Sequence, residues 1–451
     1  MSRSLLTVIL AAGKGTRMRS QTPKVLHRIA GRSMLGHVLA LAKGVGGEKL
    51  AVVVGPGMDD VRSEALAAAS GAAVFVQENQ LGTADAVLAA REAIAQHTGD
   101  LLVLFADTPL ITQETVSALI GELDRGAQVA VLGFEARDPG SYGRLVTDAS
   151  GALVAIREAK DASADELAIR LCNSGVMAFR LDRPLAVLDK IGNANAKGEF
   201  YLTDAIALVR DAGGRAGVVV CEEDEVLGVN SRRELSVAEA IWQRRARDRA
   251  MTDGATLIAP ETVWFSFDTA LGRDVLVEPN VFFGPGVTVG DEVEIKANSY
   301  LEGAQVGDGA RIGPYARLRP GAVLGRDVHI GNFVEVKNVA LGDGAKANHL
   351  AYLGDGTVGA KANIGAGTIF CNYDGFFKHK TEIGEGAFVG SNSALVAPLK
   401  IGAGAYVGSG SVITKDVPAG ALALERSEQD VRPGWAEKFR SMMARRKAAG
   451  K

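Results

Sequence analysis

The chain has 451 residues, of which 23% are charged, and its formal net charge is −3 at pH 7. This length allows two or three domains, and the charge balance predicts neither nucleic-acid nor membrane binding. The three cysteines, Cys172, Cys221 and Cys371, lie far apart and match no disulfide or metal-binding spacing. No secretory signal or membrane-spanning run is predicted, so we expect a cytoplasmic protein.

A short apolar run at Leu5–Leu10 predicts a buried parallel strand. Residues 11–18 read Ala-Ala-Gly-Lys-Gly-Thr-Arg-Met, and Pro23-Lys24 comes shortly after. Glycine lets a backbone approach a ligand closely, and N–H groups with basic side chains can then hold phosphate oxygens. The spacing matches neither the P-loop nor the dinucleotide GxGxxG motif. We therefore interpret residues 10–24 as a nucleotide-phosphate loop, the plainer alternative being a strand-to-helix turn with solvated basic residues.

Up to about Gly228, short apolar runs alternate with helical patterns, which predicts a mainly parallel, Rossmann-like α/β sheet with helices on both faces. Ligands of such sheets bind at the carboxyl ends of the strands. Ser231 and Glu234 have the spacing of a capping box, which predicts a connecting helix to about Ala250. The further predicted strands are Ala51–Gly55, Ala73–Val76, Leu101–Phe105, Val129–Gly133 and Val218–Val220, and the predicted helices are Gly82–Ala95 and Glu114–Leu123.

From about Leu257, large apolar residues recur every six positions, with small residues nearby. Six is neither a helical period nor a simple strand alternation, and it predicts a left-handed parallel β-helix of hexapeptide repeats rather than a glycine-rich linker. We thus expect a nucleotide-binding α/β domain at 1–229, a linker helix at 230–250, and a β-helix domain with a basic helical tail at 251–451. The clearest runs are Val277, Phe283, Val289, Ile295 and Leu301, and, further on, Ile383, Val389, Leu395, Ile401, Val407 and Ile413.

Polar residues near the predicted strand ends add to the first candidate site. Asp107 follows a predicted strand and Asn230 precedes the connecting helix, and both offer the oxygen ligands that Mg²⁺ prefers. Each also has an ordinary structural explanation, such as helix capping. Candidates for reading a pyrimidine edge are Gln77, Gly82 and Thr83, and candidates for a close approach to a sugar and for binding its hydroxyls are Gly143, Glu158 and Asn173.

The glycine-rich string and Pro23-Lys24 resemble the signature of sugar-nucleotide pyrophosphorylases. From Leu5 to Trp435, the chain resembles the bacterial bifunctional N-acetylglucosamine-1-phosphate uridylyltransferase/glucosamine-1-phosphate N-acetyltransferase family. The resemblance implies transfer of UMP from UTP to N-acetylglucosamine 1-phosphate with release of pyrophosphate, with Arg17 and Lys24 at the phosphates. It implies Mg²⁺ on Asp107 and Asn230. It also implies contacts to UTP or UDP-N-acetylglucosamine by Leu10, Ala11, Ala12, Gly13, Lys24, Gln77, Gly82, Thr83, Phe105, Ala106, Asp107, Gly143, Glu158, Asn173 and Asn230.

The hexapeptide period fails between Leu341 and Glu382, and loops that interrupt a solenoid are candidate functional regions. The string Asn348–Asp355 there resembles the family's catalytic string. The resemblance implies that His349 is the general base that takes a proton from the amine of glucosamine 1-phosphate, and Glu335 is a candidate to orient it. By the same resemblance the acceptor would be held by Arg319, Lys337, Tyr352 and Asn363, and acetyl-CoA by Ala366, Asn372, Tyr373, Ser391, Ser409 and Arg426.

The family resemblance further implies a homotrimer that supplies UDP-N-acetylglucosamine for cell-wall and lipopolysaccharide synthesis. Two alternatives remain open at this point. One is another sugar-nucleotide pyrophosphorylase with a non-catalytic β-helix tail. The other is a scaffold that keeps the fold without the chemistry. Phe105 and Ala106 stand where relatives commonly have tyrosine and glycine, so a tyrosine hydroxyl contact cannot be made there.

Overall fold

The computed structural model describes residues 3–149 and 151–450. The chain forms two compact units. The first consists of Met1–Asp248 with Phe265–Phe267, and the second of Arg249–Trp264 with Asp268–Lys451. Each unit buries its own apolar side chains.

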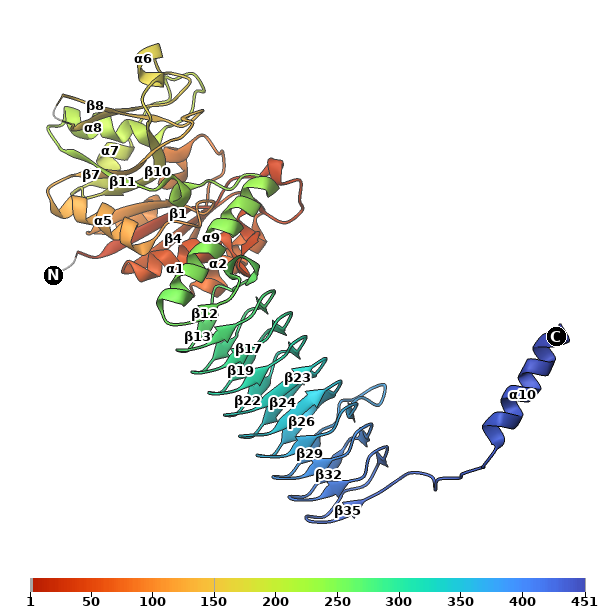
Figure 1. Cartoon of the computed structure of the whole chain (residues 1–451). Helices are drawn as coiled ribbons and strands as arrows, with labels where there is room; N and C mark the ends of the chain where they lie inside the picture. The colour runs from red at the N-terminus through yellow and green to blue at the C-terminus, as the bar shows by residue number, and fades with distance from the viewer. Residues whose placement is uncertain (1–2, 150, 451) are drawn as a thin grey trace. The chain divides into compact units, whose positions relative to one another are not determined.

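The first unit is built on a nine-stranded sheet (Figure 1). β1 pairs in parallel with β4 and β6, and β11 pairs in parallel with β7, so the predicted, mainly parallel sheet is confirmed. β10 is antiparallel to both β6 and β7, and the sequence patterns did not predict it. The main path of the sheet runs through β11 (Ala216–Cys221), β7 (Val129–Glu135), β10 (Leu171–Phe179), β6 (Asp100–Phe105), β1 (Leu5–Leu10), β4 (Gly47–Val54) and β5 (Ala73–Val76).

Alternate side chains of β1 enter two different hydrophobic cores, as expected for a strand with period two in a sheet covered on both faces. Leu5 and Ile9 belong to one core, and Leu6, Val8 and Leu10 to the other. Helices therefore cover both faces, as predicted. The helices of this unit are α1 (Met34–Gly44), α2 (Asp59–Ala68), α3 (Thr83–Ala89), α4 (Arg91–Ala95), α5 (Gln113–Asp124), α6 (Ala164–Leu167), α7 (Pro184–Leu188) and α8 (Ala205–Asp211).

The single helix predicted at Gly82–Ala95 is wrong in detail, because the structure has two helices, α3 and α4, that meet at Ala90. The backbone N–H of Ala90 bonds three residues back, to the carbonyl of Val87, which tightens the turn at this point. The remaining short elements are β2 (Arg28–Ile29), β3 (Arg32–Ser33), β8 (Arg144–Thr147), β9 (Leu153–Arg157), η1 (Thr16–Met18), η2 (Lys24–Leu26), η3 (Leu202–Asp204), η4 (Glu223–Val226) and, further along the chain, η5 (Pro260–Thr262).

The connecting helix is α9 (Arg232–Thr252). Ser231 caps it as predicted, because its hydroxyl accepts a hydrogen bond from the backbone N–H of Glu234 at 3.3 Å. The Glu234 carboxylate reaches back one residue further than a capping box requires, to the backbone N–H of Asn230 at 2.7 Å. This bond fixes the residue that immediately precedes the cap.

The second unit is a left-handed β-helix of short parallel strands (Figure 1). Where a strand has two residues, one side chain enters the coil and its neighbour faces outward: Phe283 is fully buried and Phe282 is 41% exposed. The predicted inward positions are buried along both runs, which confirms the six-residue period. Consecutive coils pair residues that are 18 positions apart, as in Leu276 and Glu294, or 17 apart, as in Ile295 and Ile312.

These strands stack into two sheets of ten and fourteen strands. The first contains β12 (Thr256–Leu257), β14 (Leu276–Val277), β17 (Glu294–Ile295), β20 (Arg311–Ile312), β23 (His329–Asn332), β25 (Lys346–His349), β27 (Asn363–Ile364), β30 (Phe388–Val389), β33 (Tyr406–Val407) and β35 (Leu422–Ala423). The second contains β13 (Ala270–Leu271), β15 (Phe282–Phe283), β16 (Thr288–Val289), β18 (Tyr300–Leu301), β19 (Ala304–Val306), β21 (Arg317–Leu318), β22 (Ala322–Leu324), β24 (Glu335–Leu341), β26 (Tyr352–Val358), β28 (Ile369–Cys371), β29 (Thr381–Ile383), β31 (Ala394–Val396), β32 (Leu399–Ile401) and β34 (Val412–Ile413).

The chain's last helix is α10 (Trp435–Ala448), and none of its residues is buried. It carries the basic character predicted for this tail, with Arg445, Arg446 and Lys447 in its last turn. Within the described part of the chain, no helix has the length and hydropathy needed to cross a bilayer.

Candidate active sites

The loop after β1 is shaped around one lysine. Gly15 adopts a left-handed conformation with φ of 62°, and a Cβ atom at this position would overlap the side-chain Cβ of Lys24. Lys24 begins η2, and its side chain is only 9% exposed. Glycine at position 15 therefore lets the lysine stem pack directly against the loop backbone. Arg17 lies on η1 and is exposed.

The Lys24 ammonium joins two further predicted residues. Its Nζ atom lies 2.5 Å from Oδ2 of Asp107 and 3.0 Å from Oδ1 of Asn230. Asp107 follows β6, a parallel neighbour of β1, so the carboxyl ends of both strands lie at the same edge. Asn230 is held there because the N–H of Val229 donates to the carbonyl of Asp107 at 2.9 Å. Two oxygen acceptors thus face one cationic group.

Three other predicted residues, Gly143, Glu158 and Asn173, also meet in the first unit. The carbonyl of Gly143 accepts a hydrogen bond from the N–H of Asn173 at 2.8 Å. A Cβ atom on Gly143 would lie 3.4 Å from Oε1 of Glu158. Burial raises the pKa of Glu158, and the positive charge of Lys197 opposes this shift. The arrangement places an amide, a carboxyl group and the buried backbone of Gly143 next to one another.

The Gln77 amide is already engaged within the protein. Its Nε2 donates to the carbonyl of Gly82 at 3.1 Å and to Oδ2 of Asp85 at 2.7 Å. The hydroxyl of Thr83 accepts from the N–H of Leu202 at 2.9 Å. In this conformation only the carbonyl side of the Gln77 amide can face a ligand. Sequence reasoning missed Asp85 because no motif distinguishes it from an ordinary first-turn acidic residue.

Part of the backbone around β1 is likewise satisfied internally. The N–H of Ala11 donates to the carbonyl of Val53 at 2.8 Å, and that of Ala106 to the carbonyl of Leu10 at 3.0 Å. The carbonyl of Ala12 accepts from Nε2 of Gln80 at 2.6 Å. These bonds extend the sheet past its strand ends, so the amides of Ala11 and Ala106 are not offered to a phosphate here. Gly13, next along the loop, is exposed, and Phe105 is half-buried at the end of β6.

In the second unit, basic residues gather on the coils around β24 and β26. Arg319 donates to Oε1 of Glu335 at 2.8 Å. Lys337 Nζ lies 3.1 Å from Oδ1 of Asp355, and the pKa of Lys378 is lowered by its hydrogen bond to Lys337 and by the charge of that lysine. Two neighbouring lysines are a candidate site for an anion, although Lys337 is already paired with Asp355.

Asp355 anchors this basic group from below the surface. Burial raises the pKa of its carboxyl group, but hydrogen bonds from Asn338, Lys337 and Asn372 outweigh burial and hold the pKa below its usual value. Asn372 donates to Oδ2 of Asp355 at 2.5 Å. The Tyr352 hydroxyl lies next to the Asn372 amide, because a Cβ atom added to Gly354 would contact both groups. Asp355 was not predicted as a site residue, although it closes the catalytic string.

His349 ends β25 and is exposed. Its Nδ1 lies 2.8 Å from Oδ1 of Asn332. The expectation that Glu335 orients this ring is wrong for this structure, because the contact is made by Asn332 and Glu335 binds Arg319 instead. The hydrogen bonds of the described residues do not join His349 to Arg319, Lys337, Tyr352 or Asn363. Asn332 and His349 are 17 positions apart, so the coil repeat itself is the sequence signal that identifies the pair.

The residues predicted for acetyl-CoA lie on later coils and in a hairpin formed by residues 373–379. Arg426 donates to the carbonyl of Ser409 at 3.0 Å. The carbonyls of Ala366 and Ser391 accept from the N–H groups of Asn392 and Gly410, one coil further on. Tyr373 begins the hairpin, pairing with Lys378, and is 61% exposed. The set is therefore distributed along the solenoid rather than gathered at one point.

The same hairpin is held together by Asp374. The His379 ring and the backbone N–H groups of Phe377 and Phe376 bind its carboxylate and lower its pKa to about 2. Phe376 and Phe377 are 86% and 70% exposed. The hairpin is thus internally ordered while it presents two aromatic rings to its surroundings.

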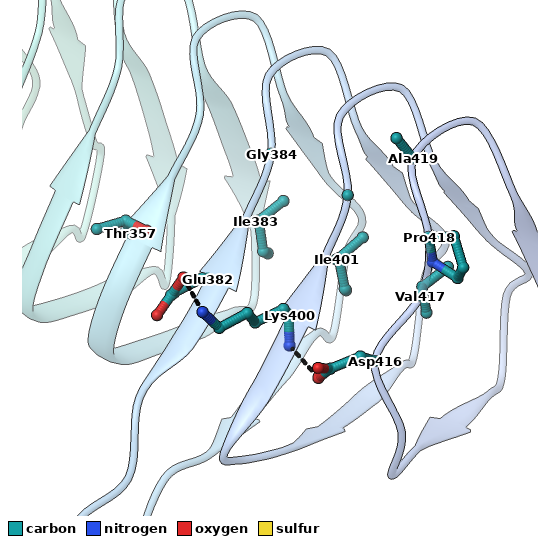
Figure 2. Close-up of a pocket in the computed structure, with 11 residues that line it drawn as sticks. Thr357, Glu382, Ile383, Gly384, Lys400, Ile401, Asp416, Val417, Pro418 and Ala419 are labelled. Atoms are coloured by element: carbon teal, nitrogen blue, oxygen red, sulfur yellow. Dashed lines mark hydrogen bonds and ion pairs between the residues drawn. The ribbon is translucent and has the colours of Figure 1, made fainter.

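A groove of about 520 Å³ lies on the last coils and contains none of the predicted site residues. Figure 2 shows Lys400 between Glu382 and Asp416 along this groove. Lys400 Nζ lies 3.3 Å from Glu382, and the Lys400 N–H donates to Asp416 at 2.8 Å. Glu382 thus pairs with the Lys400 ammonium, Asp416 accepts from a backbone N–H, and no histidine or cysteine lines the groove.

Comparisons with known proteins agree with this two-part architecture. Residues 7–171 match the MobA-like NTP transferase domain, and residues 303–338 and 380–415 match the bacterial transferase hexapeptide family (six repeats). The protein named "Bifunctional protein GlmU" of Azorhizobium caulinodans is 60% identical over 439 residues, which cover 97% of this chain and 98% of that protein.

Two further relatives with the same name are similar over nearly their whole length. The protein of Bradyrhizobium sp. is 58% identical, covering 98% of this chain and 99% of the relative. That of Xanthobacter autotrophicus is 59% identical, covering 99% of both. With both kinds of domain present in order and this identity across the whole length, the chain belongs to the GlmU family of bifunctional uridylyltransferase/acetyltransferases.

Proposed function

We propose that the first unit transfers UMP from UTP to N-acetylglucosamine 1-phosphate and releases pyrophosphate. The observation that carries this proposal is the contact of Lys24 with both Asp107 and Asn230. The sugar phosphate and the triphosphate are both anionic, so the protein must supply position and positive charge rather than a covalent partner. Lys24 and the exposed Arg17 provide that charge.

Asp107 and Asn230 are the proposed ligands of Mg²⁺. Their oxygens suit a hard divalent cation, and both already face the ammonium of Lys24, which shows that the position accommodates positive charge. When bound, Mg²⁺ would neutralise charge on the phosphates of UTP. No group of three or more His, Cys, Asp or Glu side chains with metal-binding geometry occurs among residues 3–149 and 151–450. Phosphate oxygens and water would therefore complete the coordination.

The remaining residues of the first site would position the nucleotide and the sugar. Leu10–Gly13, Phe105 and Ala106, at the ends of β1 and β6, are proposed contacts of the nucleotide, together with Gln77, Gly82 and Thr83, which follow β5. Gly143, Glu158 and Asn173 are proposed to meet the sugar, because an amide and a carboxyl group lie together beside the Gly143 backbone. Pyrophosphate release from UTP, measured with and without N-acetylglucosamine 1-phosphate and Mg²⁺, tests this proposal. No release with all three present would refute it.

We propose that the second unit transfers the acetyl group of acetyl-CoA to the amine of glucosamine 1-phosphate. His349 would take the proton that the amine loses as its nitrogen attacks the thioester carbonyl, and the thiolate of CoA would leave. Arg319, Lys337 and the nearby Lys378 would hold the phosphate, with Tyr352 and Asn363 at the sugar. Ala366, Asn372, Tyr373, Ser391, Ser409 and Arg426 are proposed contacts of acetyl-CoA.

The exposed imidazole of His349 and the exposed Lys378 beside Lys337 favour this activity over a β-helix tail that only regulates the first unit, although Lys337 itself is paired with Asp355. Release of free CoA thiol in the presence of glucosamine 1-phosphate decides between them. A protein that makes UDP-N-acetylglucosamine but releases no thiol would be a sugar-nucleotide pyrophosphorylase with a non-catalytic β-helix tail.

A homotrimer is proposed for the assembly. Phe282 and Tyr300 stack on the outside of the solenoid with ring centroids 4.9 Å apart, and Trp264 lies beside them in the same ladder. All are at least 39% exposed, and such an aromatic surface is typical of a protein–protein contact. Sedimentation equilibrium measures the mass, and a monomeric protein at working concentrations would contradict the proposal.

A further inference from the structure

The side chain of Asn332 is placed against His349 by the coil repeat. Asn332 ends β23, His349 ends β25, and the two residues are register partners in the parallel sheet. A backbone bond from the N–H of Leu350 to the carbonyl of Asn332, 3.0 Å long, fixes the two strand ends together. The 2.8 Å contact between Asn332 Oδ1 and His349 Nδ1 is therefore set by the backbone of two coils.

This contact decides which nitrogen of the ring carries the proton. A carboxamide oxygen can only accept, so Nδ1 must donate and carry the hydrogen. In the neutral ring, Nε2 is then unprotonated and has a free lone pair. An imidazole in the other tautomer would present an N–H at Nε2 and could not accept a proton there.

We propose that Asn332 is the positioning residue of the acetyl-transfer site: it holds His349 in the Nδ1–H tautomer and directs Nε2 at the attacking amine. The inference rests on the proposed role of His349 as base. Nε2 receives the proton that the amine nitrogen loses as its bond to the thioester carbonyl carbon forms. The carbon–sulfur bond breaks, and the CoA thiolate takes that proton from the imidazolium, so the ring returns to its starting tautomer.

The amide of Asn332 differs from a carboxylate because it places no negative charge beside the His349 ring. Asp374 and His379, 2.7 Å apart in the hairpin, form a pair in which a carboxylate faces the ring. Asn332 fixes the tautomer of His349 without a negative charge, so it stabilises the imidazolium less than a carboxylate would. Glu335 is not placed for this task, because its Oε1 accepts from Arg319.

The tautomer can be read directly in the full-length protein labelled with ¹⁵N-histidine. Spectra are recorded at mildly alkaline pH, where a histidine ring is neutral, and the His349 signals are assigned from their loss in His349→Gln. We expect the wild type and Asn332→Asp to show protonated Nδ1. Asn332→Leu, which keeps the volume but removes the acceptor, should shift the ring toward protonated Nε2.

Loss of the hydrogen bond between Asn332 and His349 should also change the kinetics of acetyl transfer. In Asn332→Leu, kcat for CoA-thiol release should fall roughly 10- to 100-fold, within the gain that a positioned base supplies, while KM for glucosamine 1-phosphate stays near its wild-type value. Asn332→Asp should recover most of kcat. Gln305→Met, which changes an exposed amide on β19, is the matched control and should leave both activities unchanged.

Two results would overturn the inference: a protonated Nε2 in the wild type, or an unchanged tautomer and kcat in Asn332→Leu. The first would mean that the Asn332 amide is turned around, with its NH₂ group donating to Nδ1. Failure of the proposed function is a separate outcome, because it would appear as absence of thiol release in the wild type whatever the tautomer of His349.

Discussion

Nζ of Lys24 lies 2.5 Å from Oδ2 of Asp107, although the two residues are 83 positions apart in the chain. Their side chains are 9% and 22% exposed, so each partly desolvated charge depends on the other. Removing one partner of such a pair leaves an uncompensated charge, which is costly. The pair therefore serves both to hold the loop after β1 and to keep its two charges at the place where phosphates are proposed to bind.

Lys24→Met removes this cation while it keeps much of the side chain's packing volume. We expect pyrophosphate release from UTP to fall at least about 100-fold, because a preorganised positive charge at a reacting phosphate is worth several kcal/mol. CoA-thiol release should be unchanged. The matched control is Lys43→Met, at an exposed lysine of α1. Equal uridylyl transfer by the two variants would contradict the role given to Lys24.

The two chemistries should separate cleanly by mutation. Asp107→Ala should abolish uridylyl transfer and leave acetyl transfer intact, because it removes a proposed Mg²⁺ ligand from the first unit only. His349→Ala should do the reverse. Pyrophosphate and thiol assays on both variants check this. Loss of both activities in either folded variant, with circular dichroism like that of the wild type, would argue against independent sites.

Gly15→Ala tests the packing of the phosphate loop against Lys24. Alanine must adopt the left-handed conformation at φ of 62°, at a cost of about 1–2 kcal/mol, and its Cβ must also displace the Lys24 side chain. We expect reduced uridylyl transfer and a lower unfolding temperature. Gly57→Ala is the control, since its φ is 71° but nothing lies within 4 Å of the added Cβ. If both variants behave alike, backbone strain alone explains the effect and the contact with Lys24 is unimportant.

The Asp355 carboxylate should make the β-helix sensitive to acid. Its pKa in the folded state is lower than in the unfolded chain, where it is about 3.9. The ionised carboxylate therefore stabilises the fold at pH values above its pKa in the unfolded chain. This stabilisation is lost as the pH falls through the pKa of Asp355 in the folded protein. Asp355→Asn should be less stable than the wild type near neutrality, by about 1–3 kcal/mol, with the difference shrinking below about pH 4.

Urea unfolding followed by circular dichroism at several pH values measures this difference for Asp355→Asn. Asp343→Asn serves as the control, because Asp343 is in an exposed pair with Arg326, and exposed pairs contribute little. A difference between Asp355→Asn and the wild type that does not change with pH would show that the ion pair with Lys337 is not its source.

Several elements were predictable because local pattern and burial coincide. β1 has the bounds of its apolar run, Leu5–Leu10, since all six residues are buried. β8, β9 and β10 were missed. β10 is antiparallel within a mostly parallel sheet, and its polar residues, such as Asn173, interrupt the apolar run that would identify a buried strand. The split at Ala90 was missed for a similar reason, because alanine gives no signal of a helix break.

The six-residue period alone determined the solenoid, because inward side chains can be buried only if each coil stacks on the next. The glycine-rich string predicts phosphate binding by the loop after β1. Tertiary structure decided which side chains meet. Lys24 finds one partner 83 residues away and another 206 residues away, and His349 pairs with Asn332 rather than Glu335. The reason is physical: a hydrogen bond depends on a separation of about 3 Å between two atoms, and only the packed sheet and the stacked coils fix that separation.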